Sequence, residues 1–324
     1  MNVYDFDKTI YDGDSTAHFY FYCLKKQPRI LLWLPYQAWA FFCYIIGFYD
    51  KTQFKERFYK FFKSIEKIDE LVDSFWNTHY GGIKKWYTDL QCEDDIVISA
   101  SPEFLLLPIC ERIDIKNLIA SRVDKYTGKY DGLNCYGAEK VTRLYNTYGK
   151  VEFDNFYSDS LSDAPLAMLA KKESFVVDGD KLIKWDTYKM GPVKKLLKMI
   201  FDREFLSFLF IGCVNTVNSV VFSCLYSMLL DPNSAFVMGY ITSLVISYLL
   251  NTLLTFKASL GFIKFIKFAL SYVPNFIIQY IIVFIVYNLL SLDKLIAYIL
   301  AGIIGIPVTF LMMKLFVFNK KTLK

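Results

Sequence analysis

Four aspartates lie between residues 5 and 14, close to the start of the sequence. Two of them, Asp5 and Asp7, flank Phe6 and follow the apolar pair Val3 and Tyr4. Neighbouring carboxylates repel and raise each other's pKa, so this spacing is costly without a counter-charge. The stretch is therefore either a solvated acidic loop or a site that holds a cation and performs chemistry.

Further polar groups follow the other strand-like runs of the first half of the sequence. Ser99 closes DIVIS, Asp159 follows NFYS, Asp163 comes four residues later, and Lys140 begins a helical pattern. Each is commonplace alone, because an Asp after a strand often caps a helix and a Lys on a helix is usually solvated. Because ligands bind at the carboxyl ends of parallel strands, we expect these groups to meet at one edge of a sheet.

Strand-like and helix-like runs alternate in residues 1–190. Helical patterns at 102–113 and 138–148 fall between strand candidates. The alternation predicts an α/β domain with a mostly parallel sheet and helices on both faces. The strand candidates lie at 2–5, 95–99, 118–123, 153–158 and 174–178.

A long interval, about 15–92, separates the first two strand candidates and predicts an inserted helical cap. Within it, residues 30–49 are as apolar as a membrane span. A single crossing is excluded, because it would place Asp5 and Ser99 on opposite sides of the membrane, whereas the predicted site needs them together. Two alternatives remain, a buried cap helix or a surface that lies in the lipid. Tryptophan and tyrosine favour the second, because they suit a membrane interface.

The C-terminal third predicts a membrane domain. From Glu204 onward the sequence is almost entirely apolar, after a basic linker at 191–204. Each of four segments is near or above the ~20 residues that cross a bilayer as a helix. These segments are about 205–230, 235–256, 265–291 and 295–317.

Basic residues gather before the first segment, between the second and third, and after the fourth. By the positive-inside rule, both termini and the α/β domain are then cytoplasmic, in a bacterial-type inner membrane. The net charge is only +5 and its excess flanks apolar runs, which favours membrane surfaces and not nucleic acid as partners. Seven cysteines without a C-x-x-C pair indicate free thiols in a reducing compartment.

The motifs DFDKT, VISAS, GAEK and YSDSLSDAPL, in that order, resemble those of phosphatases of the haloacid dehalogenase (HAD) superfamily. The similarity extends to about residue 185 and is closest to the phosphoserine-phosphatase-like branch. It implies a Rossmann-like parallel sheet with an inserted helical cap, and phosphomonoester hydrolysis through an aspartyl-phosphate.

This resemblance also implies the catalytic roles. Asp5 would be the nucleophile, and Asp7 the general acid and then the general base. Ser99 would hydrogen-bond the phosphoryl group, while Lys140 would neutralise its charge.

The same resemblance implies Mg²⁺ as the cofactor. Asp159 would bind the ion together with Asp5 and the backbone carbonyl of Asp7, and Asp163 would support these ligands. Oxygen ligands of this kind suit a hard divalent cation. Thr9 would tighten the loop, whereas Asp12 and Asp14 have no role in the motifs.

Residues 205–318 resemble the GtrA-like family of four-span membrane proteins, as in FLFIGCVNTVNSVVF and YLLNTLLTF. That family is associated with moving polyprenyl-phosphate-linked sugars in the synthesis of cell-surface glycans. Asparagines within apolar helices either hold helices together or line a path for lipid headgroups. Lysines at the cytoplasmic interface could hold a lipid phosphate. The candidates for lipid binding are Asn215, Asn251, Lys257, Lys264 and Lys267.

Together the two halves predict an Mg²⁺-dependent phosphatase tethered to a membrane bundle. The expected substrate is a polyprenyl-phosphate-linked sugar phosphate, which the bundle presents or flips. One alternative is a phosphatase of phospholipids or polyprenyl phosphates with the bundle as an anchor. Another is a transporter of lipid-linked sugars with a regulatory HAD domain. A four-span bundle is thin, so a homo-oligomer is also expected.

Overall fold

The computed structural model describes residues 1–191, 202–290 and 292–318. Residues 1–44 and 49–189 form one compact unit, and the rest of the described chain belongs to a second unit. Most of the predicted basic linker at 191–204 lies outside the described residues, as does the lysine-rich C-terminal tail.

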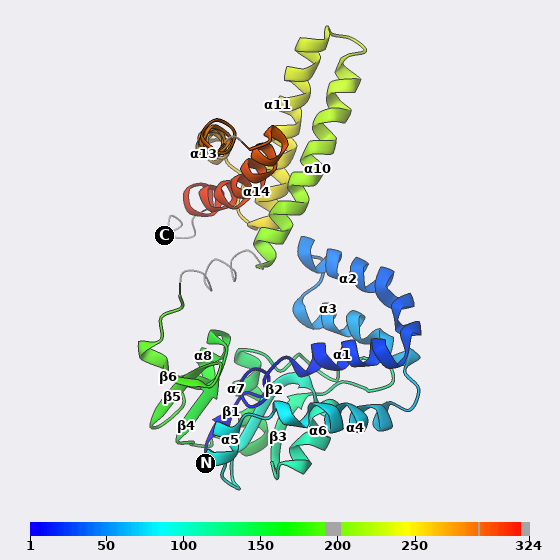
Figure 1. The fold of residues 1–324 in the computed structure, drawn as a ribbon, viewed down its shortest axis with the longest axis vertical. Helices are drawn as coiled ribbons and strands as arrows, with labels where there is room; N and C mark the ends of the chain where they lie inside the picture. The colour runs from blue at the N-terminus through cyan, green and yellow to red at the C-terminus, as the bar shows by residue number, and fades with distance from the viewer. Residues whose placement is uncertain (192–201, 291, 319–324) are drawn as a thin grey trace. The chain divides into compact units, whose positions relative to one another are not determined.

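The first unit is built on a six-stranded sheet with the strand order β3-β2-β1-β4-β5-β6 (Figure 1). Strands β1 to β5 pair in parallel, and β6 pairs antiparallel with β5. The predicted parallel sheet is confirmed. Strand β6 was not predicted, because its sequence KLIK contains no apolar run. The strands are β1 (Val3–Tyr4), β2 (Ile96–Pro102), β3 (Asn117–Ser121), β4 (Asn155–Ser158), β5 (Glu173–Asp178) and β6 (Lys181–Lys184).

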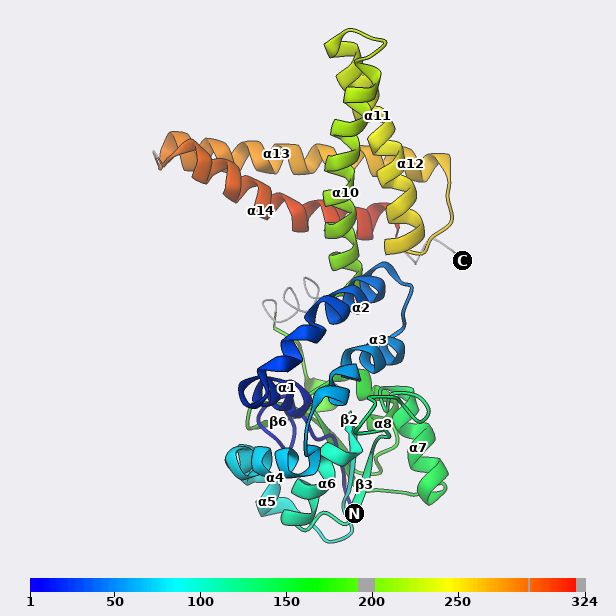
Figure 2. The ribbon, with the colours of Figure 1, turned by 90° about the vertical axis from the view of Figure 1, so that its right-hand side faces the viewer.

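Side chains of the central strands alternate between two hydrophobic clusters, because successive residues of a strand point to opposite faces. On one face, Val3, Ile96 and Phe156 pack with Leu144 of α7 (Ala138–Tyr148). In Figure 2 the sheet separates α7 and α8 from the helices on the opposite face. That face carries the next residue of each strand: Tyr4, Val97 and Tyr157.

The inserted interval supplies more than a cap. Its last two helices, α4 (Ile68–His79) and α5 (Lys85–Leu90), cover the sheet beside α6 (Glu103–Arg112) (Figure 2). Trp76 Nε1 of α4 donates to the Leu105 carbonyl of α6 at 2.6 Å. The part above the strand ends comprises α1 (Ser15–Lys26), a 3-10 helix (Pro28–Trp33), α2 (Leu34–Ile46), α3 (Lys51–Phe58) and a second 3-10 helix (Tyr59–Ser64).

The apolar segment Pro28–Ile46 is long enough to cross a membrane, but its contacts make it a surface element of the cap. Arg29 Nε donates to the Ser64 carbonyl at 2.8 Å, and Gln37 Nε2 to the Phe58 carbonyl at 3.1 Å. The start and the middle of the segment are thus tied to the same cap. One side is buried, whereas Leu32 and Trp39 on the other are 83% and 59% exposed. The segment is therefore not a fully buried cap helix.

Helices begin where the sequence provides caps. Asp14 Oδ1 accepts from the Ala17 amide at 2.9 Å and starts α1. Asp50 and Gln53 form a reciprocal capping box at the start of α3. Such caps satisfy amides that the first helical turn leaves without partners. Asp14 therefore marks the entry into the cap, and Asp12 is an exposed loop residue.

The second unit consists of apolar helices, and each of the four predicted spans is helical in the described chain. Three stretches, 203–226, 237–255 and 262–286, have the length and composition to cross a bilayer, and the stretch 303–317 is shorter but also apolar. Figure 1 shows α10 and α11 side by side. The helices are α10 (Arg203–Tyr226), α11 (Pro232–Leu250), α12 (Phe262–Leu270), α13 (Tyr272–Val283) and α14 (Lys294–Met312).

Candidate active site

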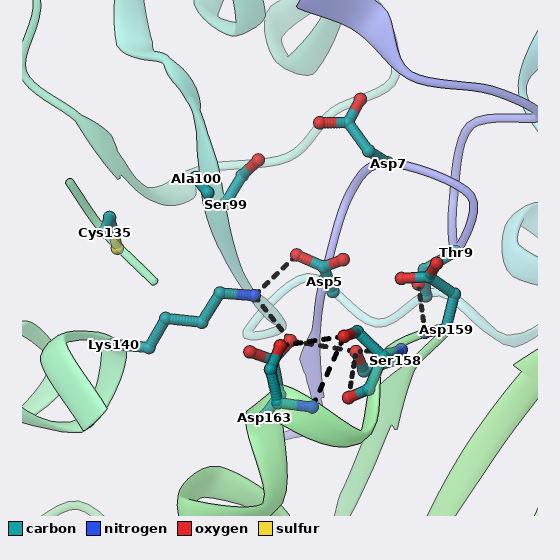
Figure 3. Close-up of polar contacts among 12 residues, drawn as sticks. Asp5, Asp7, Thr9, Ser99, Ala100, Cys135, Lys140, Ser158, Asp159 and Asp163 are labelled. Carbon is teal, nitrogen blue, oxygen red and sulfur yellow. Dashed lines mark hydrogen bonds and ion pairs between the residues drawn. The ribbon is translucent and has the colours of Figure 1, made fainter. Parts of the chain in front are cut away.

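A buried ion triad lies where β1 and β4 end. Lys140 Nζ lies 2.6 Å from Asp5 Oδ1 and 2.7 Å from Asp163 Oδ2 (Figure 3). Asp5 follows β1 directly, and its amide donates to the Tyr157 carbonyl at 2.9 Å. Lys140 comes from the first turn of α7, so the sheet and this helix fix both partners.

Asp163 orients the lysine and is itself fixed by hydrogen bonds. Its Oδ2 also accepts from Ser158 Oγ at 2.9 Å, and its amide donates to the Ser160 carbonyl at 3.1 Å. Ser158 is the last residue of β4, and it was not among the predicted site residues. The contacts place Asp163 beside Lys140, and its predicted role in supporting metal ligands stays a prediction.

The Asp7 carboxylate points away from Asp5 (Figure 3). Its Oδ1 accepts from the Ser15 amide at 2.7 Å, and its Oδ2 accepts from Ser101 Oγ at 2.5 Å. The next residue, Lys8, adopts a left-handed conformation with φ 58°. Lysine rarely takes this conformation, and such strain persists where surrounding contacts enforce it. Here Lys84 Nζ donates to the Lys8 carbonyl at 2.8 Å.

Thr9 joins the first and fourth motifs. Its buried Oγ1 accepts from the Asp159 amide at 3.0 Å. This bond holds the loop that carries Asp159 against the loop that carries Asp5 and Asp7. The predicted tightening role of Thr9 thus has a specific form, a bridge between segments 150 residues apart.

A cavity of about 610 Å³ opens onto these groups. Ser101 lines it, whereas the predicted Ser99 is buried behind and accepts from the Ser101 amide at 3.1 Å. The sequence signal for Ser101 was present, since VISAS contains two serines with period-2 spacing. The predicted residues that line the cavity are Asp5, Asp7, Lys140, Asp159 and Asp163.

Burial sets the electrostatics of the site. It raises the pKa of Asp5 to about 8, against the lowering effect of Lys140. Burial also raises the pKa of Asp7, and the nearby charge of Asp14 raises it further. Burial raises the pKa of Asp159 as well, although the charge of Lys8 opposes this. For Lys140, burial lowers the pKa, but Asp5 and Asp163 outweigh it, so the pKa is raised and the ammonium is held charged.

The donor set fits Mg²⁺. Asp5 and Asp159 present carboxylate oxygens to the same cavity, and the buried ammonium of Lys140 is already shared by Asp5 and Asp163. Five aspartates and four lysines line this cavity. This leaves negative charge in excess, and hard divalent cations prefer oxygen ligands. The residues that would hold such an ion are those expected from the sequence, Asp5, Asp159 and the backbone carbonyl of Asp7, with Asp163 in support.

In the second unit, both predicted asparagines have partners inside the bundle. Asn215 Oδ1 accepts from Ser243 Oγ at 2.7 Å, and Asn251 Nδ2 donates to the Ser247 carbonyl at 2.9 Å. The Asn215 contact joins α10 to α11 and fits the alternative in which an amide holds helices together, whereas Asn251 bonds one turn back along its own helical stretch. A role in lipid binding stays a prediction for them, as it does for the lysines.

The three predicted lysines lie around the connection between α11 and α12. Lys257 and Lys267 are exposed, and Lys264 Nζ donates to Ser259 Oγ at 2.8 Å. Lys257 has a left-handed backbone conformation with φ 47°. Their placement leaves cationic groups accessible next to apolar helices.

Comparison with known proteins separates the chain into two parts. The model of the haloacid dehalogenase-like hydrolase family matches residues 3–168, and the model of the GtrA/DPMS transmembrane domain matches residues 207–318. The first match spans half of the chain, so this protein belongs to the haloacid dehalogenase-like hydrolases. The second match makes it a membrane protein with a GtrA-like domain.

A histidinol-phosphatase from Neisseria meningitidis serogroup C (strain 8013) is 32% identical over 116 residues, which are 31% of this chain. The match spans about half (51%) of that relative's length. A solved Bordetella pertussis Tohama I protein of unknown function is 18% identical, with a TM-score of 0.45, covering 54% of this chain and 88% of its own. A phosphoserine phosphohydrolase-like protein from Francisella tularensis subsp. tularensis SCHU S4 is 14% identical, with a TM-score of 0.36. That alignment covers 54% of this chain and 85% of the Francisella protein.

Proposed function

We propose that the chain is an Mg²⁺-dependent phosphomonoesterase that acts on a lipid-linked substrate. This proposal rests on the different environments of two aspartates that lie two residues apart in the sequence. Asp5 pairs with Lys140 at 2.6 Å, whereas Asp7 is held apart by Ser15 and Ser101. One carboxylate is thus placed as a nucleophile beside a cation, and the other as a proton carrier.

In the first step, a carboxylate oxygen of Asp5 forms a bond to phosphorus while the bond from phosphorus to the leaving oxygen breaks. Asp7 gives its proton to that oxygen, and the alcohol departs. In the second step, Asp7 takes a proton from water as the water oxygen bonds to phosphorus and the bond from phosphorus to the Asp5 oxygen breaks. Inorganic phosphate leaves and the Asp5 carboxylate is restored.

Lys140 stays charged through both steps and stabilises the phosphoryl oxygens and the Asp5 carboxylate. Asp5, Asp159 and the Asp7 carbonyl would hold Mg²⁺, which when bound would supply further positive charge to the phosphoryl group. A complete set of these groups favours an active enzyme over a regulatory domain without catalysis.

The match to the GtrA/DPMS transmembrane domain supports a lipid-linked substrate. Our first candidate is a polyprenyl-phosphate-linked sugar phosphate, and the bundle presents or flips the lipid. Tethering would raise the effective concentration of a membrane-bound phosphate near Asp5. A cytoplasmic orientation in an inner membrane, and a homo-oligomer, belong to the same proposal.

The relative named a histidinol-phosphatase suggests a second substrate class, small soluble phosphomonoesters. The test is phosphate release by purified full-length protein with Mg²⁺, from a panel that includes histidinol phosphate, phosphatidic acid, prenyl phosphates and lipid-linked sugar phosphates. We expect release from the lipid-linked members and loss of release in Asp5→Asn, but not in Asp12→Asn. If every member of the panel is left intact by the wild type, the proposal is wrong.

A further inference from the structure

The cap carries an exposed apolar surface on the outer side of residues 28–46. We call it the cap face, and it consists of Leu31, Leu32, Leu34, Trp39 and Phe41. The inner side of the same segment is anchored by polar bonds. Gln37, for example, accepts from Tyr20 Oη at 2.7 Å and donates to the Phe58 carbonyl. Such anchoring fixes which side faces outward.

Aromatic rings connect the cap face to the cavity. Phe41 lies 5.9 Å from Phe54 between ring centroids, Phe54 lies 6.1 Å from Phe58, and Phe58 lies 5.0 Å from Tyr20. The last three rings line the cavity that holds Asp5 and Asp7. We call this row of rings the aromatic wall. A hydrocarbon chain that extended from the cap face along the aromatic wall would contact aromatic side chains until it reached Asp5 and Asp7.

The charge around the cap face suits the anionic headgroups of a bilayer. Residues 15–49 contain no Asp or Glu, but they contain Lys25 and Lys26, as well as Arg29, which pairs with Glu66 at 2.6 Å. Lys60 Nζ lies 4.9 Å from the ring centroid of Tyr36, near the same segment. Basic and aromatic residues around an apolar face are typical of helices that lie in the plane of an anionic membrane. The same chain carries apolar helices long enough to span that membrane.

We propose that the cap face lies in the lipid and that the aromatic wall admits the apolar part of an amphiphilic phosphomonoester into the cavity. The substrate class is then a phosphate ester whose hydrocarbon chain stays partly in the bilayer while its phosphate reaches Asp5. The substrate part of this inference rests on the proposed phosphomonoesterase function. The contact with lipid does not.

Lipid contact is tested without any activity. Full-length protein is reconstituted into vesicles of phosphatidylcholine and phosphatidylglycerol that contain a lipid with a diazirine on its acyl chain. After irradiation, mass spectrometry is expected to find label on peptides from residues 28–46 and on the membrane helices. Label on the membrane helices alone, or no more label at 28–46 than at the exposed Leu90, would overturn the proposal.

The route into the cavity is tested with two substrates that share an allylic phosphomonoester group but differ in the length of the hydrocarbon chain. Farnesyl phosphate in the vesicles and dimethylallyl phosphate in solution are compared for Leu32→Ser/Trp39→Ser and for the matched surface variant Leu90→Ser/Met168→Ser. All four residues are exposed apolar side chains. For the first variant, we expect the ratio of kcat/KM values, farnesyl over dimethylallyl, to fall about tenfold, since apolar burial is lost. The second variant should keep the wild-type ratio.

The outcomes separate the two proposals. An unchanged ratio in Leu32→Ser/Trp39→Ser overturns the lipid route and leaves the phosphomonoesterase standing. If both rates fall together and light scattering shows a smaller oligomer, a second copy of the chain covers the cap face, and the lipid proposal is wrong. If the wild type hydrolyses neither ester nor any member of the panel, the proposed function fails, while the photolabelling result still decides whether the face contacts lipid.

Discussion

Lys140 and Asp5 form a buried ion pair 2.6 Å long, although 135 residues separate them in the sequence. The same ammonium also contacts Asp163, so one cation serves two carboxylates. Asp7 has other partners, a serine hydroxyl and a backbone amide. The environments of Asp5 and Asp7 therefore differ in the way that different chemical roles require.

Replacing Lys140 by Met should reduce both activity and stability. Asp5 and Asp163 would be left buried without their cation, which typically costs about 3–5 kcal/mol. The loss of a charge beside the phosphoryl group should lower kcat by about 10² or more. Phosphate release and thermal unfolding in detergent measure the two effects. Lys150→Met, at an exposed lysine, is the control, and an unchanged unfolding midpoint in Lys140→Met would contradict the buried pair.

Removal of divalent cations should abolish phosphate release, and added Mg²⁺ should restore it. In Asp159→Asn, we expect the Mg²⁺ concentration for half-maximal activity to rise about tenfold or more, because a carboxylate ligand becomes a neutral amide. Titration of Mg²⁺ against initial rate measures this. Asp12→Asn removes an exposed carboxylate and should titrate like the wild type. Wild-type Mg²⁺ dependence in Asp159→Asn would exclude this residue as a ligand.

Ser101 should act as a positioning residue for Asp7. Without the hydroxyl that donates to Asp7 Oδ2, the Asp7 carboxylate can rotate, so Ser101→Ala should lower kcat about tenfold with little change in KM. Steady-state kinetics separate the two constants. Ser101→Thr keeps a hydroxyl and should restore most of the rate. Equal losses in both variants would mean that volume at this position, and not the hydrogen bond, matters.

Lys55 should make stability depend on pH. Its Nζ donates to the Ala100 carbonyl at 3.0 Å, and burial, reinforced by Lys51, lowers its pKa from 10.5 to about 8. Between these two values the unfolded chain binds more protons than the folded one, so the contribution of Lys55 to stability rises with pH across this window. Below pH 8 the buried charge is a cost in the folded state.

The measurement is the difference in unfolding midpoint between Lys55→Met and the wild type, taken from pH 7 to 10. Groups other than Lys55 cancel in this difference. We expect the advantage of Lys55→Met to be largest below pH 8 and to shrink as pH rises. A difference that stays constant over the range would show that Lys55 titrates alike in both states.

The sequence alone determined the family motifs and the parallel sheet. Asp5, Ser99 and Asp159 each follow or close an apolar run, and strands with helices between them place such residues at one edge. The positions of the apolar helices were also readable, because a bilayer demands a minimum length of apolar sequence. The family comparisons bear out both halves.

Only the tertiary structure decided which side chains contact one another. Ser101 and Asp7 are 94 residues apart, and Thr9 and Asp159 are 150 apart. The Asp7 carboxylate, which points away from Asp5, is held by Ser15 and Ser101. Likewise, periodicity could not tell which side of residues 28–46 is buried, since both sides are apolar. Local sequence patterns report periodicity and turns, whereas these contacts arise from the packing of segments that are distant in the chain.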